Sequence, residues 1–363
     1  MHLHDFEYLV VGSGLTGAVI SRILTDHGKK VVVIERRRDL GGNVHDWTHP
    51  SGIRVHTYGP HYFRTSSEAI WQFVSRFAVF YPFEAIIKAR VGKKLFPWPV
   101  SNQVVQGYGN SAWQEPHDGP PQNFEDAVLR KMPIPVYREF VENYTRKQWG
   151  VSPSSLSAQL AARIEVRENQ ELRLKTNKYQ GLPLDGYASF MKNMLSRIFV
   201  VPQTPFSEIR GFIPDKTKII YTGPIDEFFS FDAGRLDWRG QKRRHIFLHE
   251  PLRFPVAQVN FPSMRETAIR VIEWAHMMPP ESKYNGTVLT YETPFSPVDP
   301  TAFEYPFPDL KNHNLYKKYR SRAQLLANVT ICGRLGEYRY YDMDQAIGRA
   351  MLIARRLLQS GSA

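Results

Sequence analysis

Short apolar runs alternate with amphipathic stretches at the start of the chain. Residues 6–14 form an apolar run of β-forming residues that ends in glycine, and residues 15–28 show helical periodicity and end at Gly28. Glycine is common just past the end of a helix because it adopts left-handed backbone angles without strain. A second apolar run follows over residues 29–37. Together these segments predict a β-α-β unit, which is typical of the start of a parallel sheet.

The pattern is less regular further along the chain. Helical periodicity predicts further helices over residues 66–78, 123–132 and 135–149. Residues 107–123 are rich in Gly, Pro and Asn, which indicates a loop. Runs rich in β-forming residues predict paired strands over residues 83–100 and single strands over 253–263, 286–295 and 328–332. Small residues recurring after residue 341 predict a final helix.

Composition and length are those of an ordinary globular protein. The chain has 363 residues, of which 42% are hydrophobic and 23% are charged. No apolar run approaches the roughly 18 residues of a membrane span, and Asp5 and Glu7 stand where a signal peptide would be basic. The single cysteine, Cys332, excludes an internal disulfide and fits a reducing compartment. We therefore expect a cytoplasmic protein without a membrane span.

The net charge of +12 indicates an anionic partner. Nucleic acid, an anionic membrane and a phosphorylated small molecule are all consistent with it. The longest basic runs, over residues 35–38 and 241–245, are short and lack interleaved aromatic residues that would stack on bases. We therefore expect no nucleic-acid partner and favour a negatively charged small substrate.

A glycine motif joins the first predicted strand to the first predicted helix. The segment Gly12-Ser13-Gly14-Leu15-Thr16-Gly17 matches G-x-G-x-x-G, in which the glycines allow a tight turn, close approach of a pyrophosphate and close packing of the helix. Glu35 ends the second predicted strand, 21 residues after Gly14, where a carboxylate can bind a ribose. These features predict a dinucleotide site, with NAD and FAD both open.

A second glycine pair favours a flavin. The segment Gly41-Gly42-Asn43 follows soon after Glu35, in ERRRDLGGN, and resembles the corresponding segment of FAD-binding flavoproteins of the amine-oxidase type. We therefore predict FAD as the cofactor. The predicted cofactor-binding residues in this half of the chain are Gly12, Gly14, Leu15, Thr16, Gly17, Glu35, Arg36, Gly42 and Asn43.

The whole chain resembles a single family, the bacterial UDP-galactopyranose mutases. The segments that carry the resemblance occur in family order: VVGSGLTGAV, VIERRRDLGGN, HTYGPHYFRT, YTRKQWG, YQGLPLDGY, YTGPIDEFF and GRLGEYRYYDMD. The resemblance implies an α/β fold with an FAD-binding Rossmann-like domain, a small helical domain and an antiparallel β-sheet domain. The FAD domain is expected over residues 1–78, 182–230 and 325–363, the helical lid domain over 103–181, and the sheet domain over 79–102 and 231–324.

The resemblance also implies a reaction. Members of the family interconvert the pyranose and furanose forms of a nucleotide-diphosphate hexose, here UDP-galactopyranose or a related sugar nucleotide. N5 of the reduced flavin acts as the nucleophile at the anomeric carbon, and there is no net redox change. The implied partners are the sugar nucleotide and a flavin reductant, and a homodimer is expected. No metal site is expected.

The resemblance assigns roles to residues along the chain. Arg163 and Arg270 are expected to hold the diphosphate as it leaves and returns, because arginine stays charged and grips phosphate bidentately. Arg163 also lies in a segment that resembles the mobile lid of the family. His61 is expected beside the flavin. The predicted substrate-binding residues are Phe140, Tyr144, Trp149, Glu292, Tyr305 and Tyr340.

The segment GRLGEYRYYDMDQ, residues 333–345, resembles the part of the family that closes over the cofactor. Arg334 is expected at the FAD pyrophosphate, and Tyr340 at the substrate diphosphate. The start of the last helix is expected to direct its N–H groups toward the flavin. This adds Asp342, Met343 and Gln345 to the predicted cofactor-binding residues.

Two residues depart from the family pattern. Family members usually have a Tyr-Phe pair a few residues before YQG, where this chain has Leu174 and Lys175. A hydroxyl that commonly contacts the nucleotide is therefore missing, and a cation has been gained. The loop over residues 107–123 is also unlike the family. We therefore expect a mutase whose nucleotide or sugar differs from UDP-galactose.

Two other functions are consistent with parts of the sequence. An FAD oxidoreductase of the amine-oxidase type would share the first domain, but an amine substrate has no use for two phosphate-binding arginines. A non-catalytic sugar-nucleotide binder that keeps FAD for structure is also consistent with the sequence, although Arg163, Arg270 and Tyr340 are all present.

Overall fold

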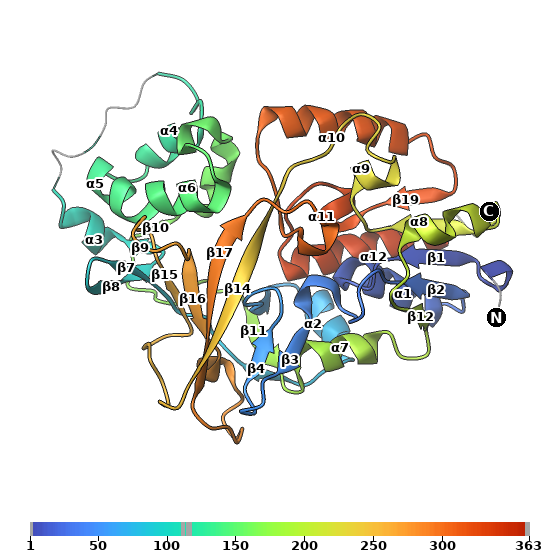
Figure 1. The fold of residues 1–363 in the computed structure, drawn as a ribbon, viewed down its shortest axis with the longest axis horizontal. Helices are drawn as coiled ribbons and strands as arrows, with labels where there is room; N and C mark the ends of the chain where they lie inside the picture. Colours follow the sequence, from blue (N-terminus) through green and yellow to red (C-terminus); the bar gives the residue numbers. More distant parts are fainter. Residues whose placement is uncertain (1–2, 110–112, 114–117, 360–363) are drawn as a thin grey trace.

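A five-stranded parallel sheet forms one side of the molecule (Figure 1). The computed structural model describes residues 3–109, 113 and 118–359. The strand order is β12-β2-β1-β13-β19, with Tyr8 paired to both Val31 and Lys218. The strand bounds are β1 (Tyr8–Val11), β2 (Val31–Ile34), β12 (Phe199–Val201), β13 (Lys218–Tyr221) and β19 (Val329–Ile331). The β-branched residues of these strands suit a sheet that is buried on both faces.

Helices cover both faces of this sheet. The helices α1 (Leu15–Asp26), α7 (Gly186–Met194) and α12 (Met343–Gln359) share one core with Val10 and Val33. On the other face, Leu9 and Val32 pack with the short helices α8 (Phe206–Ile209) and α9 (Ile225–Phe228). Alternate residues of each strand therefore enter opposite cores, as the two-residue period of a strand requires.

A seven-stranded sheet lies beside the parallel sheet, in the order β18-β14-β17-β16-β15-β7-β8. Neighbouring strands in this sheet run antiparallel, except for β15 and β7, which run parallel to each other. The two longest strands, β14 and β17, run between the helical cluster and the parallel sheet (Figure 1). The strand bounds are β7 (Ile87–Val91), β8 (Lys94–Trp98), β14 (Trp238–Leu248), β15 (Gln258–Asn260), β16 (Arg270–Glu273), β17 (Thr287–Phe295) and β18 (Tyr305–Pro306).

Smaller sheets connect these layers. One has the order β5-β11-β6, and the others are the pairs β3-β4 and β9-β10. Their bounds are β3 (Asp46–Thr48), β4 (Arg54–His56), β5 (Phe63–Thr65), β6 (Phe80–Pro82), β9 (Val100–Ser101), β10 (Val166–Arg167) and β11 (Tyr179–Pro183). The α/β fold class is confirmed, with both a parallel and a mainly antiparallel sheet. The domain boundaries given above stay predictions.

A separate helical cluster caps one end of the seven-stranded sheet (Figure 1). Its elements are α3 (Asn102–Gln106), α4 (Phe124–Leu129), α5 (Ile134–Val136), a π-helical turn over Tyr137–Glu142, and α6 (Asn143–Trp149). The predicted helix over residues 135–149 is therefore observed as one run with a π-helical centre. Of the predicted loop over residues 107–123, residues 110–112 and 114–117 lie outside the described residues.

The predicted helix over residues 66–78 is shorter in the structure, where α2 spans Glu68–Ser75. Ser67 caps α2 through its side-chain oxygen, which accepts from the backbone N–H of Ile70. A fourteen-residue helix, α10 (Leu310–Ala323), was not predicted, because only a few of its residues are apolar and few are buried. The last helix, α12, is preceded by the short helix α11 (Gly333–Gly336).

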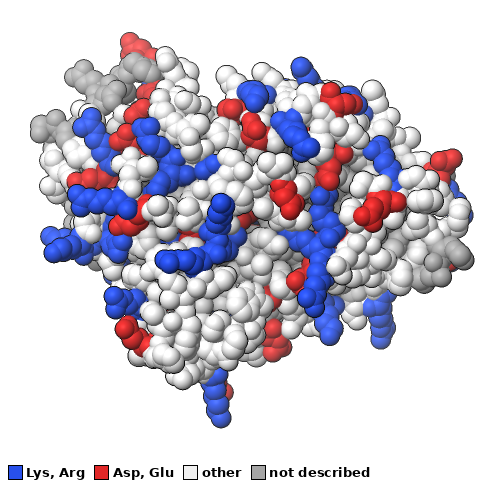
Figure 2. Space-filling view, in the orientation of Figure 1, with Lys and Arg blue, Asp and Glu red and all other residues white. Residues whose placement is uncertain are grey.

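Charge is distributed over the surface. Figure 2 shows Lys and Arg side chains interspersed with Asp and Glu on the visible face. The basic run over residues 241–245 forms part of β14, and the side chain of Arg243 is buried. No helix in residues 3–109, 113 and 118–359 is both long and apolar enough to cross a membrane.

Candidate active site

Two glycine-rich turns face each other at the carboxyl end of the parallel sheet. Gly12 follows β1 with a φ of 101°, and Gly42 has a φ of 58°, so both adopt backbone angles that favour glycine. Gly14 forms a parallel bridge with Gly41. A Cβ added at Gly42 would lie 2.9 Å from the Cα of Gly14. Both turns line one cavity, and they present backbone to it rather than side chains.

Glu35 is held in place beside this cavity. One carboxylate oxygen accepts from the backbone N–H and the hydroxyl of Ser13, both at 2.8 Å, and the other accepts from the N–H of Arg37 at 2.9 Å. Glu35 lines the cavity together with Arg36 and Arg37. A carboxylate oxygen has more than one lone pair, so Glu35 can still accept a bond from a ribose hydroxyl. Its role in ribose binding stays a prediction.

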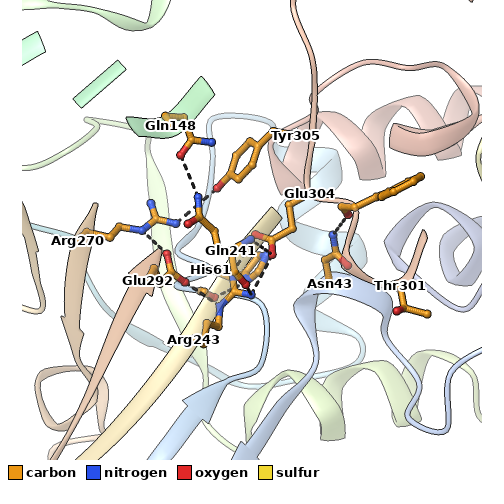
Figure 3. A network of polar contacts seen from close by, with 12 residues as sticks. Asn43, His61, Gln148, Gln241, Arg243, Arg270, Glu292, Thr301, Glu304 and Tyr305 are labelled. Carbon is orange, nitrogen blue, oxygen red and sulfur yellow. Dashed lines mark hydrogen bonds and ion pairs between the residues drawn. The ribbon is translucent and has the colours of Figure 1, made fainter. Parts of the chain in front are cut away.

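The predicted residues Arg36 and Asn43 each have protein partners. Arg36 donates to both carboxylate oxygens of Glu227, at 3.1 and 2.7 Å. The side-chain oxygen of Asn43 accepts from the guanidinium of Arg37 at 3.0 Å, and its nitrogen donates to the carbonyl of Phe303 at 3.1 Å (Figure 3). These bonds fix the rim of the cavity.

The C-terminal segment lines the cavity as well, and its contact with the cofactor stays a prediction. Leu15, Thr16, Arg334 and Met343 all line it. Arg334 donates to the carbonyl of Tyr341 at 2.8 Å, so the guanidinium is anchored by the backbone of its own segment.

The start of α12 is also held by side chains. The backbone N–H of Asp342 donates to the side-chain oxygen of Gln345 at 3.1 Å, and Arg64 donates to the carboxylate of Asp342 at 3.0 Å. Gln345 does not line this cavity. Asp342 does not line it either, but it lines a second cavity that adjoins the first.

This second cavity adjoins the first. Asn43, His61, Arg334 and Met343 line both. The second cavity is lined also by Tyr58, Pro60, Tyr62, Arg64, Ile87, Leu174, Gln258, Arg270, Glu304, Tyr305, Tyr340, Asp342 and Asp344. The structure therefore brings Arg270, Tyr305 and Tyr340 into a cavity that adjoins the one lined by the glycine turns.

Stacked aromatic and cationic side chains form one wall of this cavity. The rings of Tyr305 and Tyr340 stack with centroids 5.7 Å apart and planes 7° from parallel. The guanidinium carbons of Arg163 and Arg334 lie 3.9 and 4.6 Å from the centroid of the Tyr340 ring. Arg163 is exposed at the end of a 3-10 helix over Ala158–Arg163. It has no carboxylate partner in the described part of the chain, so its charge is available to an anion.

A row of charges crosses three neighbouring strands beneath this wall (Figure 3). The sheet register places Arg243 of β14 and Arg270 of β16 on either side of Glu292 of β17. Arg243 Nε donates to Glu292 at 2.8 Å, and Arg270 donates to the other oxygen of Glu292. Arg243 also donates twice to Glu304, at 2.9 Å each. The cluster therefore contains two cations and two anions, and Arg270 reaches Tyr305 at 3.5 Å.

Burial and ion pairing oppose each other in the cluster. Burial by itself would raise the pKa of Glu292, but Arg270 and Arg243 outweigh it, so the pKa is lowered. Burial raises the pKa of Glu304, and Arg243 only partly offsets this effect. Glu292 is thus the more firmly ionised of the two acids. The sequence had predicted Arg270 and Glu292 but missed Arg243 and Glu304.

His61 lies at the junction of the two cavities. Its Nδ1 is 2.8 Å from the carbonyl of Gly59, and its backbone N–H donates to Nδ1 of His56 at 3.1 Å. Burial, reinforced by the charge of Arg334, lowers the pKa of His61 to about 3. His61 is therefore neutral at neutral pH and can present an N–H or a lone pair, but not a positive charge.

Three predicted aromatic residues lie in or beside the helical cluster. Phe140 is completely buried and packs against Phe96, and Trp149 is buried against Phe307. Neither lines the cavities. Tyr144 stacks with Trp98, and its pKa is raised to about 12 by burial despite the nearby charge of Arg270. Their roles in substrate binding stay predictions, and Tyr144 is the nearest of the three to the charged row.

The two residues that depart from the family pattern have different positions. Leu174 lines the second cavity, with its backbone N–H donating to the carbonyl of Ala85 at 2.7 Å. Lys175 is exposed and pairs with Glu165 at 3.3 Å. The change to leucine therefore alters the cavity wall, whereas the change to lysine alters the surface.

The fold defines a Rossmann-like dinucleotide-binding protein, and a second cavity lined by arginine and tyrosine residues adjoins the dinucleotide cavity. A family model described as an NAD(P)-binding Rossmann-like domain matches residues 10–77, and a second model, described as UDP-galactopyranose mutase, matches residues 139–340. The chain belongs to the UDP-galactopyranose mutase family, and the enzymes of this family are isomerases.

Curated relatives span nearly the whole chain. A Klebsiella pneumoniae protein named "Probable UDP-galactopyranose mutase" is 32% identical over 99% of this chain and 96% of its own length. An Escherichia coli protein named dTDP-fucopyranose mutase is 28% identical over 98% of this chain and 99% of its own length. The family thus includes proteins named for two different sugar nucleotides.

Solved structures share the fold. A crystal structure of reduced UDP-galactopyranose mutase superposes with a TM-score of 0.81 at 15% identity, covering 99% of this chain and 95% of that chain. A redesigned putrescine oxidase superposes with a TM-score of 0.62 at 11% identity, covering 98% of this chain and 99% of that chain. At these identities the likeness shows the fold alone.

The residues at the glycine turns fit a flavin dinucleotide. A Cβ at Gly42 would lie 2.9 Å from the Cα of Gly14, so the two turns pack this closely only because Gly42 has no side chain. The backbone N–H groups of such turns bind pyrophosphate, and the guanidinium of Arg334 lies on the same cavity. No group of three or more metal-binding side chains occurs among the described residues.

Proposed function

We propose that the protein is an FAD-dependent mutase that interconverts the pyranose and furanose forms of a nucleoside diphosphate hexose without net oxidation. The observation that carries this proposal is the junction of the two cavities. Residues of the dinucleotide cavity, including His61 and Arg334, also line the cavity that holds Arg270, Tyr305 and Tyr340. A flavin and a diphosphate sugar would therefore meet at this junction.

The arginines bind the diphosphate through each stage of the reaction. Reduced flavin, when bound, supplies a nucleophilic nitrogen, N5, for the anomeric carbon. Arg270 and Arg163 offer their fixed charges to the diphosphate, which must leave the sugar and later return to it. The hydroxyls of Tyr305 and Tyr340 lie on the same wall and can donate to phosphate oxygens.

Glu292 and Arg243 position Arg270 rather than contact the substrate. Glu292 accepts from both arginines and so fixes the plane of the Arg270 guanidinium. Preorganised charges of this kind stabilise a leaving anion without having to reorient during the reaction. Neutral His61 keeps further positive charge away from the junction, where the electron-rich reduced flavin must act as a nucleophile.

We infer UDP-galactopyranose or a related hexose nucleotide as the substrate class, because relatives named for UDP-galactopyranose and for dTDP-fucopyranose are similar over the whole chain. The active form would be the reduced flavoprotein, so a separate reductant must supply electrons once before turnover. The overall reaction returns the flavin to the reduced state.

The test uses purified flavoprotein reduced with dithionite under anaerobic conditions. UDP-, dTDP- and GDP-hexoses would be incubated with it, and the products would be analysed by chromatography and NMR. We expect a furanose isomer of unchanged mass from at least one donor, and none with oxidised flavin. Oxidation of the sugar, or no isomer from any donor although the flavin is bound and reduced, would overturn the proposal.

A further inference from the structure

Two branched aliphatic side chains, Ile87 and Leu174, lie in the wall of the substrate cavity, whose other lining residues are mostly charged, hydroxylated or amide side chains. They come from neighbouring segments. The backbone N–H of Leu174 donates to the carbonyl of Ala85 at 2.7 Å, and Ile86 forms a bridge with Arg173. Ile87 and Leu174 therefore form one apolar patch.

The loop that carries Leu174 is fixed from beneath by Arg167. The Arg167 side chain is only 7% exposed. It donates to the carbonyl oxygens of Glu171 at 2.9 Å and of Leu174 at 2.8 Å, and also to that of Arg173. Three carbonyl groups held by one buried guanidinium give the loop a defined path. Leu174 is thus a preset part of the cavity wall.

Polar groups near the patch already have protein partners. The hydroxyl of Tyr62 donates to the side chain of Gln258 at 3.2 Å, and Gln258 donates to Asn260 at 2.9 Å. A sugar hydroxyl placed on the patch would lose its water and would face aliphatic carbon. Burying a hydroxyl without a partner is unfavourable, whereas a methyl group gains from the same burial.

We propose that Leu174 and Ile87 select a sugar that is deoxygenated at C6, so that the substrate is a nucleoside diphosphate 6-deoxyhexose. This inference rests on the proposed mutase function. Ring contraction requires the oxygens on C4 and C5, and the diphosphate occupies C1, so these positions must keep their oxygen. Loss of oxygen at C2 or C3 would leave a CH₂ group within the ring, whereas loss at C6 leaves the reacting atoms intact and creates a methyl group. Arg167 acts as the positioning residue for the patch.

The test compares donors that differ by one oxygen atom. UDP-galactopyranose would be paired with UDP-fucopyranose, its 6-deoxy analogue, and the dTDP forms of the two sugars would make a second pair. With reduced flavoprotein, we expect kcat/KM to favour the 6-deoxy donor about tenfold to hundredfold in both pairs, since a hydrophobic pocket discriminates against an added hydroxyl to about this extent.

Each outcome has a separate meaning. Equal rates, or preference for galactose, would overturn this inference and leave the mutase function standing. A preference for the UDP donors over the dTDP donors, or the reverse, with no difference between the two sugars would also overturn it. Isomerisation of none of the four donors, with flavin bound and reduced, would instead contradict the proposed function itself.

Variants test the patch directly. Leu174→Asn keeps the number and branching of the side-chain heavy atoms and offers hydrogen bonds, so we expect the preference for the 6-deoxy donor to fall about tenfold or to reverse. Leu172→Asn is the matched control, because Leu172 is 49% exposed on the same loop and does not line the cavity. Arg167→Met should lower the same ratio, which a general loss of stability would not change. An unchanged ratio in Leu174→Asn and Arg167→Met would overturn the assignment of the patch.

Discussion

The guanidinium carbon of Arg163 lies 3.9 Å from the centroid of the Tyr340 ring, although 177 residues separate them in the sequence (340 − 163). This contact places an exposed cation from the helical cluster on the aromatic wall of the substrate cavity. A planar guanidinium can stack on the ring and still offer N–H groups to a diphosphate, whereas a lysine ammonium cannot do both. Arg163 is therefore in a position to donate to an anion bound at this wall.

We expect Arg163→Lys to lower kcat/KM about tenfold to hundredfold, because hydrogen bonds to a charged group contribute about 1.5–3 kcal/mol. Steady-state assays of the reduced enzyme would measure this effect. Arg138→Lys serves as the control, since Arg138 is exposed on the same helical cluster and does not line the cavity. Equal activity of the two variants would contradict the role of Arg163.

The buried charge row predicts a large effect on stability. Arg243→Met leaves Glu304 buried without its cation, and breaking a buried ion pair in this way costs about 3–5 kcal/mol. Urea unfolding would measure the loss at pH 8, and we expect a smaller loss at pH 5, where Glu304 can take up a proton. Arg322→Met removes an exposed pair with Asp232 and is expected to be nearly neutral. Similar losses in both variants would contradict the argument.

The sequence predicted those parts of the site that depend on local geometry. The first glycine turn and Glu35 follow from a short motif in a defined position relative to a strand and a helix, whereas the second glycine turn and the segment around Arg334 were indicated by resemblance to known flavoproteins. The structure places all of them on one cavity. The local spacing of the first turn and Glu35 was therefore sufficient to indicate a dinucleotide site.

Arg243 and Glu304 were missed because their role depends on strand register. Arg243, Glu292 and Arg270 meet only because β14, β17 and β16 pair in one alignment, which a single sequence does not specify. One signal was present: within the run QKRRH, alternate residues Gln241, Arg243 and His245 fall on one face of a strand. The run had been considered only as a possible contact for nucleic acid.

For Phe140 and Trp149, the sequence pattern does not distinguish a core residue from one that contacts a ligand. Aromatic residues at helical spacing pack into a core more often than they bind a ligand, and the structure buries both in the helical cluster. Only the resemblance to a family had suggested a substrate contact. Periodicity alone cannot distinguish the inner face of a helix that packs on its own domain from one that packs on a bound nucleotide.

The two buried histidines predict that stability decreases in acid. Burial lowers the pKa of His61 to about 3, reinforced by the charge of Arg334, and lowers that of His56 well below its usual 6.5, reinforced by charge on His61 and Arg54. Between pH 6.5 and 3 the unfolded chain binds protons that the folded chain does not. The free energy of unfolding should therefore fall with pH in this window, by about 1.4 kcal/mol per unit for each histidine.

Unfolding of His61→Asn, measured between pH 7.5 and pH 4.5, would isolate the effect of one histidine. We expect its pH dependence to be shallower than that of the unmodified protein by about 1.4 kcal/mol per pH unit below 6.5. His313→Asn, on the exposed face of α10, should leave the slope unchanged. A slope that is the same in all three proteins would show that His61 takes up its proton equally in the folded and unfolded states.

Alanine at Gly42 should weaken flavin binding, and alanine at Gly28 shows how much of the effect is due to backbone strain alone. Gly42 and Gly28 both have positive φ, 58° and 74°, so alanine is strained at either position. Only at Gly42 would the new Cβ press on a neighbour, 2.9 Å from the Cα of Gly14, whereas nothing lies within 4 Å at Gly28. Overpacking of this kind costs about 1–3 kcal/mol, so we expect flavin affinity to fall about tenfold to hundredfold in Gly42→Ala.

The bound flavin per protein chain, measured by absorbance after gel filtration, would distinguish the two variants without an activity assay. Gly28→Ala should be less stable than the unmodified protein but should retain its flavin, because Gly28 lies at the far end of α1 from the cavity. Equal flavin loss in both variants would mean that strain alone weakens binding. Full retention in Gly42→Ala would show that the close packing of Gly42 on Gly14 is not needed for flavin binding, which would contradict the role given to these turns.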